Sequence, residues 1–401
     1  FRRLFCKFIK MRIHKLYYIF VQLVFMLFSI KTVKAQEKIN FLESSFTEVF
    51  KTANLQKKPI MYMFYATWCG HCDKMKKETL IDPEVVQYFN KNYVCAWQDM
   101  EVGQGPMLRK KYEIKSYPAF LFFDTSGVLV SQILGEFKPS DLIKEAQNAL
   151  IPEKQIPYLK KQFEKDVSNA QNCLDYIMAL RKGRIDFDGI AQRYFKTVEE
   201  KDLLSDMNWK IFANGIMDIQ SREFKYVLSH QKEFADLISK TRVDRKLTYT
   251  INEYLKPSAD AGDTLNYEKR KSIVLQTHYA KMDSIVYAND LVAYEKSKSW
   301  NKYAAAAQKF IKEFYWNNQS KLKEIAENIA NNVSDKSSLM KAAEWAERAL
   351  ELRELFDTYM VCAKAYSKMG ETEKARQFAQ KGKELAIKNK SSYTEAEQYL
   401  K

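Results

Sequence analysis

Residues 65–72 read Tyr-Ala-Thr-Trp-Cys-Gly-His-Cys, and this stretch decides the fold of the chain around it. It follows an apolar run, Ile60–Phe64, that predicts a buried strand, and a charged pattern from Asp73 predicts a helix after it. Two cysteines at a strand–helix junction suit dithiol chemistry, because the positive end of the helix stabilises a thiolate on Cys69. Cys72, one turn later, can then attack a mixed disulfide formed by Cys69.

Two other interpretations of the cysteine pair compete with this one. A zinc site needs about four ligands, and no second Cys-x-x-Cys or His-x-His is present, so we expect neither a metal nor a cofactor. A purely structural disulfide between Cys69 and Cys72 is sterically tight but stays open. His71 favours redox chemistry, because its protonated ring stabilises the thiolate and hence the reduced form.

Residues 1–35 predict a signal peptide. Basic residues at positions 12 and 15 precede a nearly uninterrupted apolar run of 15 residues, Leu16–Ile30. This run is shorter than the roughly 20 residues that a membrane span needs. We expect a cut between Ala35 and Gln36, with an uncleaved anchor as the alternative, and residues 1–10 as an upstream extension.

Export implies an oxidising compartment, in which paired cysteines persist as disulfides, and the bacterial periplasm fits best. The formal net charge of +15 includes eight basic and no acidic residues in the first 35, so the mature chain carries 15 − 8 = +7. Residues 36–150 hold 14 basic and 14 acidic residues. The remaining excess is spread over alternating-sign helical sequence, which argues against nucleic-acid binding.

The chain from 36 to 152 predicts a compact α/β domain. Proline, glycine and apolar runs mark its elements in the order α, β, α, β, α, β, β, α. The expected helices are 41–58, one after the cysteine pair that restarts at Asp82, 107–112 and 139–150, and the expected strands are 60–65, 93–98, 119–123 and 128–134. The last two strands are joined by an Asp-Thr-Ser-Gly turn and predict a hairpin.

This order, the Cys69/Cys72 pair and the stretch Ser116–Phe123 resemble the thioredoxin-fold family over residues 37–150. Leu80–Val85 and residues 99–101 are also similar to exported thioredoxin-like proteins related to the soluble end of the thiol:disulfide interchange proteins. The resemblance implies a central mixed sheet flanked by helices.

The resemblance also implies a substrate groove beside the dithiol. In the family, the proline that matches Pro118 is cis and faces the two cysteines. Trp68 and Gly70 would lie on one side of the groove and Tyr117 on the other, where the Tyr117 backbone can pair with a substrate strand. These four residues are our predicted substrate contacts, and Cys69, His71 and Cys72 are our predicted catalytic residues.

One position departs from the family pattern. Thioredoxins commonly carry a buried acid in the strand before the motif, where this chain has Met63, so proton transfer must use water, Glu78 or another group. Met63 and His71 together favour oxidase or isomerase character over thioredoxin-like reduction.

The other three cysteines of the expected mature chain are interpreted as buried apolar residues rather than as redox partners of the pair. They are Cys95, Cys173 and Cys362.

Residues 158–401 predict an all-α region, since they are poor in proline and glycine and show helical spacing. Small residues at 342, 346 and 349 recur at 375, 379 and 382, a shift of 33. Together with Tyr359 and Cys362, this pattern resembles tetratricopeptide repeats near 323–389.

These observations predict an exported thiol–disulfide oxidoreductase. Its expected partners are cysteine-containing exported proteins and a membrane or soluble thiol-redox protein, with further protein docking on the helical region. Two alternatives stay open: a helical-repeat adaptor with a redox-sensitive thioredoxin-like domain, and a reductase dedicated to one maturation pathway.

Overall fold

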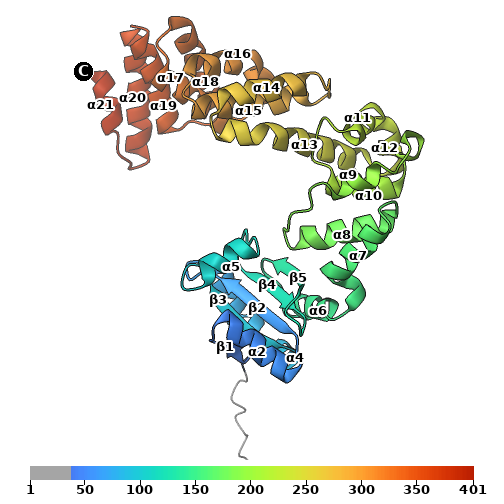
Figure 1. Ribbon diagram of the computed structural model, residues 1–401. Coiled ribbons are helices and arrows are strands. Elements are labelled where there is room, and N and C mark those ends of the chain that lie inside the picture. Colours follow the sequence, from blue (N-terminus) through green and yellow to red (C-terminus); the bar gives the residue numbers. More distant parts are fainter. Residues whose placement is uncertain (1–37) are drawn as a thin grey trace, which may run out of the picture. The chain divides into compact units, whose positions relative to one another are not determined.

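The computed structural model describes residues 38–401, so the predicted signal peptide lies outside the described residues. The chain divides into two compact units, of which the first ends at Phe187 and the second begins at Asp188 (Figure 1). The domain limits expected from the sequence, 36–152 and 158–401, stay predictions.

The first unit contains a five-stranded mixed sheet with the order β1-β3-β2-β4-β5. Strands β1, β3 and β2 are parallel, β4 is antiparallel to β2, and β5 is antiparallel to β4. The strands are β1 (Phe41–Leu42), β2 (Ile60–Tyr65), β3 (Val94–Asp99), β4 (Ala119–Phe123) and β5 (Leu129–Leu134). The helices are α2 (Phe46–Gln56), α3 (Gly70–Lys77), η1 (Thr79–Ile81), α4 (Pro83–Asn92), α5 (Gly105–Lys111), α6 (Pro139–Ala149), η2 (Pro152–Lys154), α7 (Ile156–Lys165) and α8 (Ala170–Lys182). The expected α/β class is confirmed.

Successive residues of β2 point to opposite faces of the sheet, and both faces are covered by a hydrophobic core. Met61 and Met63 belong to one core, which also contains the cysteine pair and side chains of α3, α4 and α6. Tyr62 and Phe64 belong to the other core, with side chains of α2 and α5. This double burial explains why β2 is an uninterrupted apolar run.

The start of the first helix differs from the expectation of a helix over 41–58. Helix α2 begins at Phe46, after Ser45, whose hydroxyl accepts a hydrogen bond from an amide of the first turn. Phe41 and Leu42 instead form the edge strand β1 beside β3, and the Phe41 ring stacks on Trp97 with centroids 4.3 Å apart. A two-residue strand is too short to show a periodic pattern. Phe41 lies close before the apolar residues of the helical face that begins at Phe46, so the sequence predicted a helix from Phe41.

Two local signals acted as expected. Asp82 caps α4 by accepting hydrogen bonds from two backbone amides at 3.0 and 3.2 Å, and Pro83 is the first helical residue. In the β4–β5 turn, the Asp124 carboxylate accepts from the amides of Ser126 and Val128, both at 2.9 Å. The hairpin and the restarted helix are therefore confirmed.

Helices α7 and α8 extend the first unit beyond the sheet and pack against β5 (Figure 1). The buried Gln132 on β5 donates from Nε2 to the carbonyl of Gly183 at 2.8 Å. Lys182 forms an ion pair with Glu145 of α6. The chain that follows α6 is thus part of the same compact unit up to Phe187.

The second unit is all-α in the described residues. Its helices are α9 (Ile190–Phe195), η3 (Glu200–Asp202), α10 (Asp206–Gly215), α11 (Arg222–Ser229), α12 (Gln231–Leu237), α13 (Lys240–Asp260), α14 (Thr264–Leu275), α15 (Met282–Lys296), α16 (Trp300–Phe314), α17 (Gln319–Asn332), α18 (Lys336–Leu352), α19 (Phe356–Lys368), α20 (Thr372–Lys388) and α21 (Thr394–Leu400). From α17 to α21 each helix packs against the next.

The small residues that recur at a shift of 33 are all buried: Ala342, Ala346 and Ala349 on α18, and Ala375, Ala379 and Gly382 on α20. A Cβ atom at Gly382 would lie 2.7 Å from Met360 Cε and 3.0 Å from Tyr359 Cβ of α19. Glycine therefore allows the close approach of α19 and α20. This packing agrees with paired helices, while the tetratricopeptide-like repeat stays a prediction.

Candidate redox site

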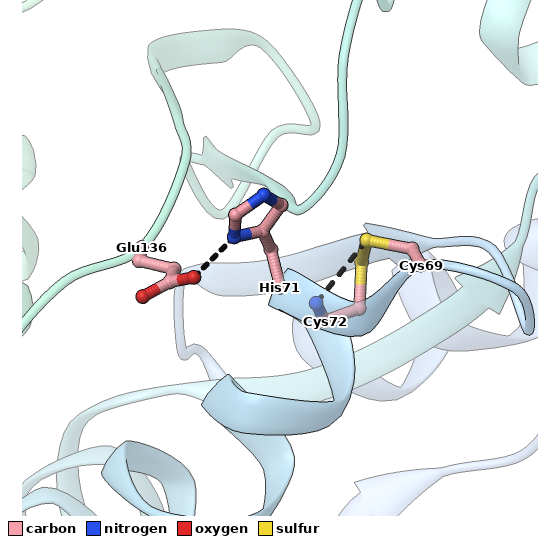
Figure 2. The surroundings of a disulfide bond; sticks show 4 residues. All are labelled: Cys69, His71, Cys72 and Glu136. Atoms are coloured by element: carbon pink, nitrogen blue, oxygen red, sulfur yellow. Dashed lines mark hydrogen bonds and ion pairs between the residues drawn. A yellow bond between two sulfur atoms is a disulfide. The ribbon is translucent and has the colours of Figure 1, made fainter. Parts of the chain in front are cut away.

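The cysteine pair lies at the end of β2, where the chain turns into α3. Cys69 is the N-cap residue of α3, and its amide donates to the carbonyl of Ala66 at 3.1 Å. The Sγ atom of Cys69 accepts a hydrogen bond from the Cys72 amide at 3.1 Å, and the two sulfurs form a disulfide bond (Figure 2). In the reduced protein, the same amide and the helix dipole would stabilise a thiolate on Cys69.

Exposure differs between the two cysteines. Cys69 is 6% exposed and Cys72 is fully buried, so an external thiol reaches Cys69 first. Trp68, immediately before the pair, is 72% exposed. A Cβ atom at Gly70 would have no heavy atom within 4 Å, so this glycine leaves open space next to the disulfide.

His71 is paired with a residue that the sequence did not suggest. Its Nδ1 lies against a carboxylate oxygen of Glu136 (Figure 2). The second carboxylate oxygen of Glu136 accepts a hydrogen bond from Lys74 Nζ at 2.7 Å. The hydrogen bonds from Lys74 and His71 lower the pKa of Glu136, and Glu136 raises the pKa of Lys74. The negative charge of Glu136 therefore lies next to His71, whose positive charge we expected to stabilise the Cys69 thiolate.

The loop that carries Glu136 is attached to both sides of the site. The amide of Gly135 donates to the carbonyl of Pro118 at 2.8 Å. The Phe137 amide contacts Met75 Sδ of α3 at 3.3 Å, and the Phe137 carbonyl accepts from the Thr79 hydroxyl at 2.7 Å. These contacts connect the helix with the dithiol to the segment before β4.

That segment contains Tyr117 and Pro118, which we predict to contact the substrate. The peptide bond between Tyr117 and Pro118 is cis. The Tyr117 ring meets the Trp68 ring edge-on with centroids 6.0 Å apart, and the Arg109 guanidinium lies 5.7 Å from the Tyr117 ring. The backbone amide and carbonyl of Tyr117 make no hydrogen bond with any residue from 38 to 401, so both are available to an added strand.

No acid lies behind the disulfide at the position of Met63, which is fully buried. Asp99 is the one buried carboxylate in residues 38–150, and it accepts from the Glu101 amide at 2.9 Å at the end of β3. Glu78, which we considered for proton transfer, is exposed at the opposite end of α3 from Cys69. Of water and Glu78, water is therefore the remaining candidate for proton transfer at the cysteine pair.

The remaining described cysteines form no disulfide with the pair. Cys95, Cys173 and Cys362 are free and buried. Burial raises the pKa of Cys173 to about 12, and it also raises the pKa of Cys95 and Cys362. Thiols that are buried and protonated are poor nucleophiles, in agreement with their interpretation as core residues.

Residues 38–401 contain no cluster of three or more side chains suited to hold a metal ion. Within the same residues, every helix is too short or too polar to cross a membrane.

Comparison with known proteins adds to this geometry. A family model described as a thioredoxin-like domain matches residues 46–150. The chain is 30% identical to the chloroplastic thioredoxin Y2 of Arabidopsis thaliana over 125 residues, which are 30% of this chain and 65% of that protein. It is 29% identical over 99 residues to the thiol:disulfide interchange protein DsbD of Yersinia pestis, covering 24% of this chain and 17% of that protein.

Among solved structures, a candidate disulphide-isomerase from Bacteroides thetaiotaomicron is 35% identical. The match covers 29% of this chain and 96% of that one, with a TM-score of 0.28. The match to thioredoxin Y2 and the match to DsbD each cover less than two thirds of the length of that relative.

Proposed function

Residues 46–150 are a thioredoxin-like domain, and on this premise we propose that the chain is an exported thiol–disulfide oxidoreductase that acts on cysteines of client proteins. The observation that carries the proposal is the position of the pair: Cys69 caps α3, accepts the Cys72 amide and is disulfide-bonded to Cys72. A structural disulfide would not need the adjacent exposed Trp68 or the unpaired Tyr117 backbone.

The proposed reaction is a pair of thiol–disulfide exchanges. In the oxidising direction, a client thiolate attacks Cys69 Sγ, the bond between Cys69 and Cys72 breaks, and Cys72 leaves as a thiolate. A second client thiolate then attacks the client sulfur of the mixed disulfide, so the client gains a disulfide and Cys69 leaves as a thiolate. The reducing direction is the reverse, with Cys69 as the nucleophile and Cys72 as the resolving thiol.

Local charge sets which direction is favoured. The α3 N-terminus and a protonated His71 stabilise the Cys69 thiolate, which makes the disulfide a better oxidant. Glu136 counteracts His71, because its carboxylate contacts the imidazole. We propose oxidase or isomerase character from His71 and Met63, with Glu136 moderating the oxidising strength.

Compartment and partners are part of the same proposal. The predicted signal peptide at 1–35 supports export to a bacterial periplasm, where client proteins form disulfides. A membrane or soluble thiol protein would restore the redox state of the pair. The packed helices from α17 to α21 would serve as a docking surface, as stacked helix pairs do in repeat proteins.

Reduction of insulin and refolding of a reduced, denatured disulfide protein test the activity with the full-length chain. We expect both to occur with the native protein and to be abolished in Cys69→Ser. If the native protein supports neither reaction, the chain is an adaptor with a redox-sensitive domain.

Trapping of clients with Cys72→Ser separates a broad oxidoreductase from a dedicated reductase. The variant should hold mixed disulfides at Cys69, because the resolving thiol is missing. Many partners would support the proposal, and one repeated partner would support a reductase of a single maturation pathway.

A further inference from the structure

The end of α8 places an arginine next to the segment Ser116–Pro118, which we predict to form one wall of the substrate groove. Arg184, just after α8, donates from Nη1 to the Ser116 hydroxyl at 3.1 Å. Ser116 precedes Tyr117, whose backbone groups make no hydrogen bond in residues 38–401 and whose ring meets that of Trp68. The family match ends at residue 150, so this arginine comes from a segment outside the matched domain.

The position of Arg184 is fixed by its surroundings. The carbonyl of the preceding Gly183 accepts from the buried Gln132 side chain at 2.8 Å. At the end of α8, the amide of Arg184 donates to the carbonyl of Arg181 and the amide of Ile185 to that of Leu180, both at 3.0 Å. Arg184 is therefore held at the helix end rather than on a free loop.

The backbone conformation of Arg184 is also unusual for its type. Its φ is +51°, in the left-handed region where a helix end normally carries glycine. Lys57, Lys298 and Lys390 adopt the same conformation, so this geometry fixes the direction of the backbone at Arg184 and is not itself evidence of a function.

The charge of Arg184 is not neutralised by a described neighbour. Arg184 is exposed and forms no ion pair with residues 38–401, whereas Arg109, which lies near the Tyr117 ring, is paired with Glu101 at 3.5 Å. A client strand that pairs with the Tyr117 backbone would pass beside the free guanidinium, which binds carboxylates well.

We propose that Arg184 is a specificity-determining residue that selects client segments with an acidic side chain near the reacting cysteine. This inference rests on the proposed exchange activity at Cys69 and names the class of substrate for it. The occupant is an extended, acidic, cysteine-containing peptide segment of a client protein.

Two dithiol peptides test the proposal. One has acidic residues flanking its cysteines, and the other is identical except that Asn or Gln replaces each Asp or Glu. The oxidised full-length protein converts each dithiol to a cyclic disulfide, while Cys69 and Cys72 take up the two electrons and become thiols. Mass spectrometry gives the rate constants. At low salt we expect the acidic peptide to react roughly two- to five-fold faster than the amide peptide, which is the effect that one exposed charge pair allows. In 0.5 M salt this rate advantage should shrink, because charges are then screened over a distance on the order of 4 Å.

Arg184→Gln should remove this preference, and Arg184→Lys should retain part of it. Lys161→Gln is the matched control, because it removes one exposed positive charge from α7 and should leave the preference unchanged. The rate with dithiothreitol should be the same in all variants, which shows that the disulfide is intact.

The outcomes separate this inference from the proposed function. A native protein that oxidises both peptides equally, or an Arg184→Gln protein that keeps the acidic preference, overturns the role of Arg184 and leaves the exchange activity standing. A native protein that oxidises neither peptide contradicts the proposed activity itself.

Discussion

The carboxylate of Glu136 contacts the imidazole of His71 across 65 residues of sequence. This contact puts a negative charge next to His71, one of the two residues between the cysteines, and Lys74 pairs with the same carboxylate. The Cys69 thiolate is thus affected by the charges of His71, Lys74 and Glu136 and by the N-terminus of α3. The Cys-Gly-His-Cys motif alone does not reveal the charge of Glu136.

Glu136→Gln should make the site more oxidising. Without the carboxylate, the positive charges of His71 and Lys74 act on Cys69 unopposed, so its thiolate and the reduced form are stabilised. We expect the pKa of the Cys69 thiol to fall, because a negative charge near the thiolate has been removed. Alkylation rates between pH 4 and 9, and redox equilibration with glutathione, measure the two effects.

Glu153→Gln serves as the control for this change, since Glu153 is an exposed acid in η2. It should leave both quantities unaltered. A higher thiol pKa in Glu136→Gln would show that Glu136 supports the thiolate instead of opposing it.

Met63→Asp should destabilise the domain in a pH-dependent way. The new carboxyl would be fully buried in the core that contains the disulfide, and burial raises its pKa. Because the folded-state pKa is the higher one, the charge-dependent part of the destabilisation is absent below the unfolded value near 3.9 and grows as the pH rises toward the raised folded pKa. The loss of apolar contacts destabilises the domain at every pH. We expect a loss of roughly 2–4 kcal/mol at pH 7.

Urea unfolding at pH 4 and pH 7 measures this dependence. Met63→Leu, which conserves volume, should lose less than about 1.5 kcal/mol at either pH. An equal loss at both pH values in Met63→Asp would mean that the carboxyl escapes to solvent.

Alkylation should distinguish the five described cysteines in the reduced native protein. Cys69 lies at a helix N-terminus and is 6% exposed, the highest value of the five, whereas Cys72, Cys95, Cys173 and Cys362 are 0–2% exposed. With a brief pulse of iodoacetamide at pH 7, peptide mapping should find modification at Cys69 alone, and at all five after unfolding in urea. Rapid native labelling of Cys362 would contradict its place in the core between helices.

Gly382→Val should weaken the packing of α20 on α19. A Cβ at this position would lie 3.0 Å from Tyr359 Cβ, which cannot move without its helix. We expect the free energy of unfolding to fall by roughly 1–3 kcal/mol. Valine has a higher helix propensity than glycine, so a loss of stability in Gly382→Val comes from packing. Lys381→Val, at the neighbouring exposed position, should lose only a few tenths of a kcal/mol, and an unchanged stability of Gly382→Val would contradict the close packing.

The sequence predicted those parts of the site that depend on local pattern. The position of Cys69 at the start of a helix follows from an apolar run next to a charged one, and the resemblance around Pro118 implied the cis peptide bond that the structure contains. Strand β1 was missed because two residues carry no periodicity. Glu136 and Arg184 were missed because each reaches the site from a distant turn, and a solitary charged residue in a turn looks like any solvent-exposed one.

The contact between Gln132 and Gly183 bears on how the thioredoxin-like domain can be cut from the chain. Strand β5 is an outer strand of the sheet, and α7 and α8 pack against it. A protein that ends near residue 150 would lose these helices, uncover one side of β5 and leave the Gln132 amide without its acceptor. Exposed outer strands recruit further strands, so the shortened domain should tend to aggregate, while one that extends to Phe187 should remain monodisperse.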